Sequence, residues 1–233
     1  MSVDFRLLSE QLERICSRRV ALRPVSLADG WSLYEATRNP IFNQHLLWAQ
    51  PANEDEVLER MDAIVDATRS GRMAALSAVV KKTGEWISLF RFQPYASDPK
   101  AMEMGVWTHD RFWQGRYSLE LSCLCVDAAF LTSDVEMLIG ASSPDNRSSC
   151  RLMEITGMKP LQIVRRQAES GALIELREYG VTRDEWRGLR PNAPTSLSVF
   201  PFRDAGPGAL APMGVTPSGR ATAPFEAGEL EAA

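Results

Sequence analysis

Apolar residues recur at two different spacings along the first 190 residues, and the two spacings predict different elements. Intervals of three and four residues, as in Leu8, Leu12 and Ile15, place apolar side chains on one side of a helix. Alternation and short apolar runs bounded by turn residues indicate strands. Helices are predicted over residues 5–17, 27–39, 54–71, 117–131 and 146–156. Strands are predicted over residues 19–25, 75–81, 85–92, 101–107, 135–141, 162–167 and 173–178.

The order of these elements predicts one domain built in three layers. After a helical extension in residues 1–18, residues 19–189 would form a mixed α/β (α+β) domain in which helices cover both faces of a sheet. Residues 190–233 are rich in proline, glycine and alanine and carry few bulky apolar side chains. Such a tail cannot bury enough surface to offset the entropy of ordering it, so we expect it to be largely disordered.

Local signals mark where two of the helices begin and end. Ser26 is a suitable N-cap for the helix that follows it, and Pro40 ends that helix because the residue before a proline avoids helical angles. Farther along, Asp145 or Asn146 can cap the first turn of a short helix, and Gly157 can supply its left-handed C-cap. The apolar side of this short helix would consist of Leu152, Met153 and Ile155.

The charge balance and the lack of long apolar runs exclude several functions. The 233 residues include 26 basic and 30 acidic side chains, so the net charge is −4 and no strong basic field exists to bind nucleic acid or an anionic membrane. No apolar run approaches the ~20 residues that cross a bilayer, and the N-terminus lacks a signal-peptide core, which predicts a cytoplasmic location. The cysteines and histidines lack metal-site spacing, so no metal is expected.

Residues 145–158 carry the pattern Asp-Asn-x-x-Ser-x-x-x-x-Glu-x-x-Gly-Met. This pattern resembles the closing motif of the GNAT N-acyltransferases, specifically the branch that acetylates the N-termini of ribosomal proteins. Residues 102–107 are similar to the family's Glu-x-Gly-Tyr-Trp strand, and residues 113–118 are similar to its phosphate-binding loop. The resemblance covers roughly residues 19–187 and implies the three-layer GNAT fold, with a central, mostly antiparallel sheet. The motif positions are Asn146, Ser149, Glu154, Gly157 and Met158.

The resemblance implies an acyl-CoA-dependent N-acyltransferase that takes acetyl-CoA as co-substrate and uses no metal. An amine of the acceptor would attack the thioester directly, without a covalent enzyme intermediate. A small-molecule amine and a protein N-terminus both suit this chemistry, and a monomer and a homodimer both stay open. The alternative is a catalytically inactive GNAT-like binding or scaffold protein whose CoA loop has been altered.

The predicted phosphate-binding loop is the reason for that alternative. By resemblance, the pyrophosphate would be held at a helix N-terminus by Gln114, Gly115, Arg116, Tyr117 and Ser118. Family members usually carry a second glycine two residues after the first, and this chain has lost it or carries Arg116 in its place. Arg116 would then either block the phosphates or bind them through its guanidinium. A further interpretation is a plain connection in which Trp113 and Tyr117 pack in the core.

The resemblance also implies roles for the strand before the loop and for the helix of the closing motif. Backbone groups of Val106, Trp107 and Thr108 would lie along the pantetheine arm, where neighbouring strands must splay. Glu103 would accept the proton of the amine, directly or through water, unless it only pairs with an arginine. By the same resemblance, Asn146 would hydrogen-bond the pantetheine, although it also suits plain helix capping, and Ser149 would hydrogen-bond or protonate the leaving thiolate.

Three features fall outside these motifs. Residues 41–49 are apolar for a loop between helices and are expected to wall the acceptor pocket. His109 lies beside the predicted loop, where it could bind phosphate or relay a proton, or be an ordinary side chain like His45. The proline-rich tail is a candidate segment for docking a partner.

Overall fold

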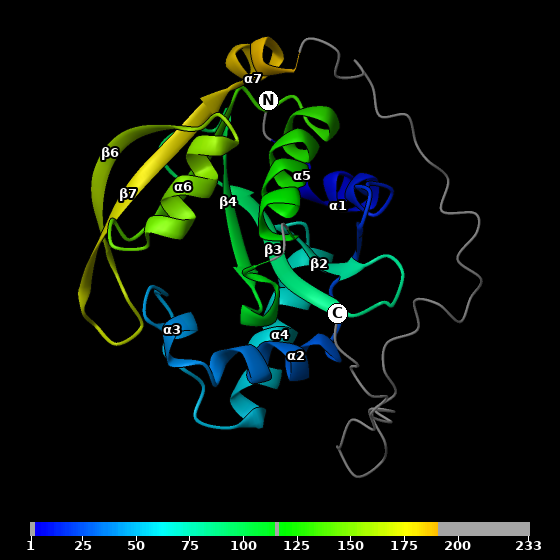
Figure 1. Cartoon of the computed structure of the whole chain (residues 1–233), viewed down its shortest axis with the longest axis vertical. Coiled ribbons are helices and arrows are strands. Elements are labelled where there is room, and N and C mark those ends of the chain that lie inside the picture. The colour runs from blue at the N-terminus through cyan, green and yellow to red at the C-terminus, as the bar shows by residue number, and fades with distance from the viewer. Residues whose placement is uncertain (1–2, 115–116, 191–233) are drawn as a thin grey trace, which may run out of the picture.

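The computed structural model of the protein describes residues 3–114 and 117–190 (Figure 1). The strands are β1 (Val20–Pro24), β2 (Ala74–Val80), β3 (Trp86–Pro94), β4 (Ala101–Thr108), β5 (Met137–Ser142), β6 (Lys159–Gln167) and β7 (Leu173–Thr182). They form one sheet in the order β1-β2-β3-β4-β5-β7-β6. All neighbours are antiparallel except β4 and β5, which run parallel. The prediction of a mostly antiparallel central sheet is confirmed.

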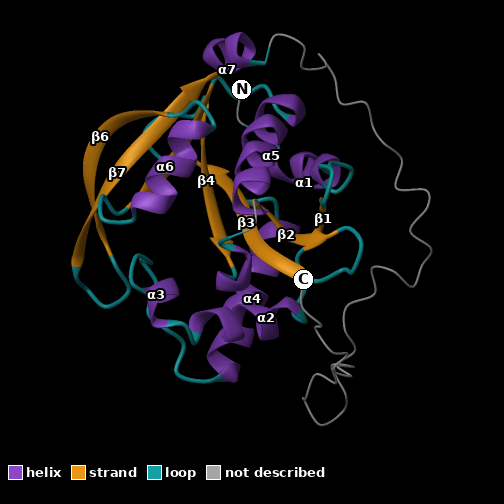
Figure 2. Ribbon diagram, in the orientation of Figure 1, coloured by secondary structure: helices purple, strands orange, loops and turns teal. Residues whose placement is uncertain are grey.

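Helices cover both faces of this sheet, as predicted. They are α1 (Phe5–Leu12), α2 (Asp29–Thr37), α3 (Pro40–Asn43), α4 (Glu54–Arg69), α5 (Tyr117–Thr132), α6 (Arg147–Ile155) and α7 (Arg183–Leu189), with a 3₁₀ turn at Asp110–Phe112. Figure 2 shows α2, α3 and α4 gathered together and the β6–β7 hairpin on the side of the molecule away from α1. No helix in the described part of the chain is long and apolar enough to cross a membrane.

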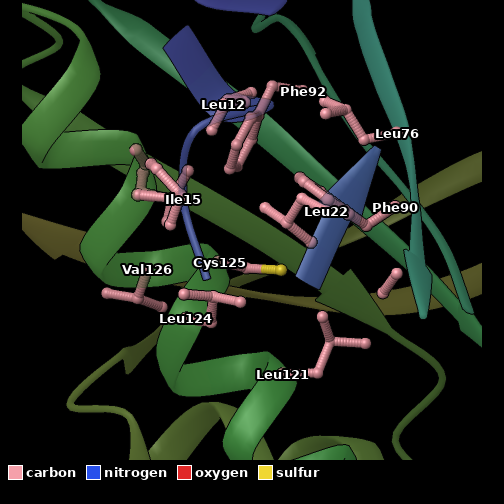
Figure 3. Close-up of a cluster of buried hydrophobic side chains, with 14 of the residues drawn as sticks. Leu12, Ile15, Leu22, Leu76, Phe90, Phe92, Leu121, Leu124, Cys125 and Val126 are labelled. Atoms are coloured by element: carbon pink, nitrogen blue, oxygen red, sulfur yellow. The ribbon is translucent and has the colours of Figure 1, made fainter. Parts of the chain in front are cut away.

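Two apolar clusters, one on each face, hold the layers together. The larger cluster joins α1, α5 and α6 to the sheet, and Figure 3 shows Cys125 of α5 among leucines of α1, β1 and β2. The smaller cluster joins α2 and α4 to the opposite face through Leu33, Met61 and Leu89. Burial of apolar side chains contributes about 25 cal/mol per Å² removed from water, so these two clusters fix which face each helix covers.

Several element boundaries differ from the sequence prediction. The helix predicted over residues 5–17 ends at Leu12, and the chain then turns so that Cys16 bridges Ala21. Helices α3 and α7 were not predicted, although α7 carries a capping box in which Thr182 and Glu185 satisfy each other's backbone amides. The expected apolar side of α6 is partly wrong, because Ile155 is exposed and Cys150 is buried in its place beside Met153.

Ser26 does not cap α2, which corrects another prediction. Ala28 occupies the N-cap position, and the Ser26 hydroxyl instead donates to the Asp29 carboxylate at 3.2 Å. This carboxylate is buried and also accepts from Arg23 and from the Ser77 hydroxyl. A buried charge requires partners, so Asp29 claims the hydroxyl that would otherwise cap the helix.

Gly140 on β5 lets α6 lie close to the sheet. A Cβ atom built at this position would stand 3.0 Å from the Met153 sulfur and 3.3 Å from the Met158 methyl carbon. Met104 of β4 is the next neighbour, at 3.7 Å. The missing side chain therefore sets the separation between α6 and the point where β4 meets β5.

We predict that Gly140→Ala lowers the free energy of unfolding by about 1–3 kcal/mol, because an added methyl group overpacks a filled contact. Urea denaturation measures this change. Gly188→Ala is the control, because a Cβ at this helical position meets no atom within 4 Å. It should leave stability unchanged or slightly higher. Equal stability of Gly140→Ala and the parent protein would contradict the prediction, because it would show that the space between Gly140 and Met153 can accept a methyl group.

Candidate active site

The parallel pairing of β4 with β5 ends while both strands continue. Four pairs are formed, from Ala101 with Met137 to Met104 with Gly140. Beyond them, β4 runs on to Thr108 beside β3 alone, and β5 runs on to Ser142 beside β7 alone. We call this separation the splay. It lies at the carboxyl ends of both strands.

The pairing of β4 with β3 decides which backbone groups face the splay. The His109 amide donates to the Ile87 carbonyl at 2.9 Å, so these two residues form a hydrogen-bonded pair. Such pairs recur at every second residue, and Trp107 therefore directs its amide and carbonyl at β3. Val106 and Thr108 direct theirs the other way. Of the three residues predicted to contact the donor arm, these two present their main chain to the splay.

The start of helix α6 follows closely on the end of β5. Asn146 is its N-cap, and its side-chain oxygen accepts from the Ser149 amide at 3.2 Å. The predicted cap is thus confirmed for Asn146, and Gly157 ends the helix with a left-handed φ of 96°. Ser149 is half-buried, and its hydroxyl has no hydrogen-bond partner among the residues that the structure describes. This hydroxyl is free to meet a ligand.

Only part of the predicted phosphate-binding loop is described. Gln114 is exposed, while Gly115 and Arg116 lie outside the described residues. The Ser118 hydroxyl, in the first turn of α5, donates to the Phe112 carbonyl at 3.0 Å. The Tyr117 ring packs edge-on against Phe112, as the plain packing interpretation predicts for this residue.

Trp113, the other aromatic residue of the loop, does not pack in the core as that interpretation expected. It is 41% exposed, and its indole N–H donates to the Thr108 carbonyl at 2.8 Å. The Thr108 carbonyl is therefore already engaged, which leaves its amide and the Val106 backbone facing the splay. Trp113 thus ties the end of β4 to the start of the loop.

Glu103 lies on the face of the sheet opposite α5. Met102 and Met104 pack into the larger apolar cluster, and strand residues alternate between faces, so Glu103 points the other way. Arg166 of β6 donates to Glu103 Oε1 at 2.6 Å. The sequence left open whether Glu103 pairs with an arginine, and it does.

The same guanidinium also contacts Glu178, a buried carboxylate on β7. Arg166 Nη2 donates to Glu178 Oε1 at 2.8 Å. Glu178 Oε2 accepts from the Tyr95 hydroxyl at 3.0 Å and from the Gln162 amide at 2.8 Å. Arg166 therefore joins carboxylates from two strands that lie on either side of β5.

These contacts shift the pKa values of the buried groups. Burial alone would raise the pKa of Glu178, but the hydrogen bonds from Gln162, Arg166 and Tyr95 outweigh it and hold that pKa below its usual value. Burial alone would lower the pKa of Arg166, and the two carboxylates instead raise it. Burial raises the pKa of Tyr95, and its hydrogen bond to Glu178 adds to the effect. Glu178 and Arg166 are thus charged at neutral pH, and the Tyr95 hydroxyl keeps its proton.

Two tryptophans and two arginines form a stack beside this cluster. The Trp48 and Trp107 rings are 5.4 Å apart and nearly parallel. The Arg60 guanidinium lies 4.6 Å over Trp48, and the Arg91 guanidinium lies 5.0 Å over Trp107. Each cation–π contact contributes about 0.5–2 kcal/mol. The stack joins α4 and the loop before it to β3 and β4.

The loop between α3 and α4 is fastened to the tip of the β6–β7 hairpin. Glu169 at the tip accepts from the Ala49 amide at 2.8 Å and from Arg60 at 2.8 Å and 3.1 Å. The Glu169 amide donates to the Leu47 carbonyl at 2.8 Å. The segment predicted to wall the acceptor site therefore closes against the hairpin that carries Arg166.

Among the described residues, the contacts of His109 are those of a packed side chain. His109 Nδ1 lies 2.6 Å from the Asp110 carboxylate, and Asp110 also accepts from the Asn39 amide at 2.6 Å. Residues 3–114 and 117–190 contain no group of three or more His, Cys, Asp or Glu side chains that could hold a metal ion. His109 is mostly buried and packs against Trp86 and Phe112, which favours the ordinary structural role.

Sequence reasoning missed Arg166, Glu178, Tyr95 and Arg91. A signal did exist for three of them, because Arg91, Arg166 and Glu178 are charged residues inside predicted strands, and a charge that becomes buried needs a partner. The sequence could not show which strands would bring them together.

Comparison with known proteins identifies the family and the fold. A family model described as an acetyltransferase (GNAT) domain matches residues 19–159. A solved GNAT acetyltransferase from Bacillus anthracis has a TM-score of 0.63 at 14% identity, over 73% of this chain and 98% of its own. RimJ from Mycobacterium smegmatis, solved with CoA-disulfide, has a TM-score of 0.59 at 16% identity, over 71% and 83%.

The ribosomal L7/L12 alpha-N-protein acetyltransferase RimL, solved with coenzyme A, has a TM-score of 0.62 at 14% identity, over 72% of this chain and 97% of its own. At such identities the likeness shows the fold alone. No curated protein sequence matches the chain significantly.

We predict that Glu178→Gln lowers the free energy of unfolding by about 1.5–3 kcal/mol at pH 7, because charged hydrogen bonds are lost. The pKa of Glu178 is lower in the folded chain than the ~4.3 of an unfolded one. Its contribution is therefore present above that value and lost as pH falls through the folded pKa. Urea denaturation between pH 3 and 7 should show the difference shrinking below about pH 4. Glu175→Gln, in an exposed 3.8 Å pair with Arg165, is the control and should change little.

Proposed function

Because the chain belongs to the GNAT acetyltransferase family, we propose that it transfers the acetyl group of acetyl-CoA to a primary amine by direct attack. The amine nitrogen bonds to the thioester carbonyl carbon, and the carbon–sulfur bond then breaks. The amine loses a proton, and the CoA thiolate leaves. No covalent enzyme intermediate is required.

The observation that carries this proposal is the splay between β4 and β5. The splay is an opening in the sheet. It connects the face that α5 and α6 cover with the face that carries Glu103. A thioester arm entering from the first face would bring its carbonyl carbon toward the second. Donor and acceptor could then meet from opposite sides of one sheet.

We propose that the donor is held by backbone groups around the splay. The Val106 amide and carbonyl and the Thr108 amide would pair with the pantetheine arm as an added strand would. The first turn of α5, with Tyr117 and Ser118, would face the pyrophosphate through its unpaired amides. Gln114, Gly115 and Arg116 would complete this loop, and Asn146 would hydrogen-bond the arm from α6.

Glu103 would accept the proton of the amine, and Ser149 would stabilise the departing thiolate. Arg166 contacts Glu103 Oε1, and Glu103 Oε2 makes no hydrogen bond within the described residues. The Ser149 hydroxyl is likewise free. A hydroxyl is a weak acid, so its contribution would be chiefly a hydrogen bond to the developing negative charge.

The acceptor is proposed only as a class, either a small-molecule amine or a protein N-terminus, met in the cytoplasm. RimL is described as acting on a protein N-terminus, and MccE, another solved structure of this fold, was crystallised with acetyl-CoA and AMP. This architecture therefore occurs in an enzyme named for a protein substrate and in one that binds a small molecule beside acetyl-CoA. The segment of residues 41–49 would form part of the acceptor side, because Trp48 stacks on Trp107 of β4.

Acetyl-CoA should raise the melting temperature of the protein. At a concentration 100 times the Kd, ligand binding adds about 2.7 kcal/mol to the stability of the folded state. Differential scanning fluorimetry measures this shift. Asn146→Ala should reduce it, and Asp145→Ala, which changes the exposed neighbour, should not. An unchanged melting temperature at saturating acetyl-CoA would contradict donor binding.

Glu103→Gln should lower kcat by about 100- to 10,000-fold, because an amide cannot accept the proton. Ser149→Ala should lower kcat less, by about tenfold to 100-fold, since it removes one hydrogen bond to a developing charge. Thiol release from acetyl-CoA with a panel of amines is the measurement. Ser148→Ala, at an exposed position beside Ser149, is the control. Full activity of Glu103→Gln would remove Glu103 from the mechanism.

A further inference from the structure

Arg166 reaches the candidate base from a distant strand. It lies on β6, the edge strand of the sheet, and contacts Glu103 on β4 across the positions of β7 and β5. Figure 1 shows that β6 and β7 form a long hairpin at one side of the sheet. The hydrogen bond itself requires this hairpin to bend toward the face that carries Glu103, because two strands separate β6 from β4 in the sheet. Arg166 therefore belongs to the site by geometry although it is remote in the sheet order.

The ion pairs that Arg166 forms with Glu103 and Glu178 are largely shielded from water. The side chain of Arg166 is 27% exposed, that of Glu103 is 14% exposed, and that of Glu178 is 2% exposed. Two carboxylates at such low exposure disfavour each other's ionisation unless a cation lies between them. Arg166 supplies that cation through two separate nitrogens, one for each carboxylate.

The two carboxylates differ in how many of their oxygens accept hydrogen bonds. Both oxygens of Glu178 accept hydrogen bonds, from Arg166 on one side and from Tyr95 and Gln162 on the other. Glu103 gives one oxygen to Arg166, and its Oε2 accepts no hydrogen bond from any described residue. Glu178 is therefore an anchor, whereas Glu103 retains an oxygen that can receive a proton.

We propose that Arg166 is a positioning residue that holds Glu103 ionised, with Oε2 directed at the amine. This rests on the proposed function, in which Glu103 is the proton acceptor. As the nitrogen–carbon bond forms, Glu103 Oε2 takes the amine proton while Arg166 stays protonated and keeps Oε1. Glu178 fixes the guanidinium, and Glu169 at the hairpin tip ties the same hairpin to the acceptor-side loop.

Other charged groups near Glu103 bear on its ionisation. Arg91 on β3 faces it, and burial lowers the pKa of Arg91 while Glu103 opposes that effect. Glu178 on β7 lies beyond the Arg166 guanidinium, and Tyr95 hydrogen-bonds to Glu178. On β5, the neighbouring residues Ile139 and Ala141 carry no charge. Arg166 makes the direct hydrogen bonds, so its removal should have the larger effect.

The test compares Arg166→Gln and Arg166→Lys with Arg165→Gln. Arg165 is the next residue of the same strand, and its exposed side chain pairs with Glu175 at 3.8 Å. For Arg166→Gln we expect kcat to fall by about 100-fold, the scale of a misplaced catalytic group. The acidic limb of the kcat/KM profile should move to higher pH by about one unit or more, because a cation that favours the carboxylate is gone.

The control and the lysine variant separate positioning from folding. Arg165→Gln should leave both the rate and the pH profile in place. Arg166→Lys keeps the positive charge but lacks the planar fork that bridges two carboxylates. Compared with Arg166→Gln, it should return the acidic limb to the pH of the parent enzyme and recover only part of kcat. Binding of acetyl-CoA should be equal in all variants, because Arg166 lies away from the proposed donor contacts.

An NMR titration of the carboxyl carbon of Glu103 tests the role of Arg166 without an activity measurement. The Glu103 signal is assigned with the variant Glu103→Gln. Its midpoint should rise in Arg166→Gln and not in Arg165→Gln. An unmoved midpoint, or an Arg166→Gln enzyme as active as the parent with an unmoved acidic limb, would overturn the role of Arg166. A moved midpoint in a protein that acetylates no amine would instead uphold the role of Arg166 and overturn the proposed function.

Discussion

The early end of the β4–β5 pairing is the constraint on which the rest of the site depends. A parallel ladder satisfies the backbone groups of both strands, and here it does so for four residue pairs only. Past Met104, the outward amide and carbonyl of Val106 lie beyond the ladder. A sheet that remained paired to the ends of both strands would have no opening through which its two faces could communicate.

The two faces beside the splay are built from different chemistry. One face is closed by the apolar cluster that joins α1, α5 and α6, where shape alone sets the packing. The other carries buried charges that must be paired to be tolerated, since one charge without its partner costs several kcal/mol. Arg166 meets that requirement for Glu103 and Glu178 together. The charged cluster consequently ties the edge hairpin to the centre of the sheet.

Much of the candidate site was predictable because it depends on local sequence. Asn146 caps α6 and Gly157 ends it, as their residue types indicate, since a cap needs only a short polar side chain and a left-handed turn needs only a glycine. The strand carrying Glu103 and the helix after residue 116 also stand where their apolar spacing places them. The exposure of Trp113 was not predictable, because an aromatic residue beside a core is expected to be buried in it.

The sequence by itself determined the order and type of most elements, the mixed α/β class, and the positions of Glu103, Asn146 and Ser149 on their strand and helix. These follow from periodicity and capping, which act over a few residues. Tertiary structure alone decided that Arg166 and Glu178 join Glu103, that Val106 rather than Trp107 offers its main chain to the splay, and that Asp29 takes the hydroxyl of Ser26. The first two depend on strand register or on contacts between residues far apart in sequence. Ser26 and Asp29 are neighbours in sequence, but Asp29 is buried against Ser77 of β2, and the energy of such a contact exists only once the sheet has formed.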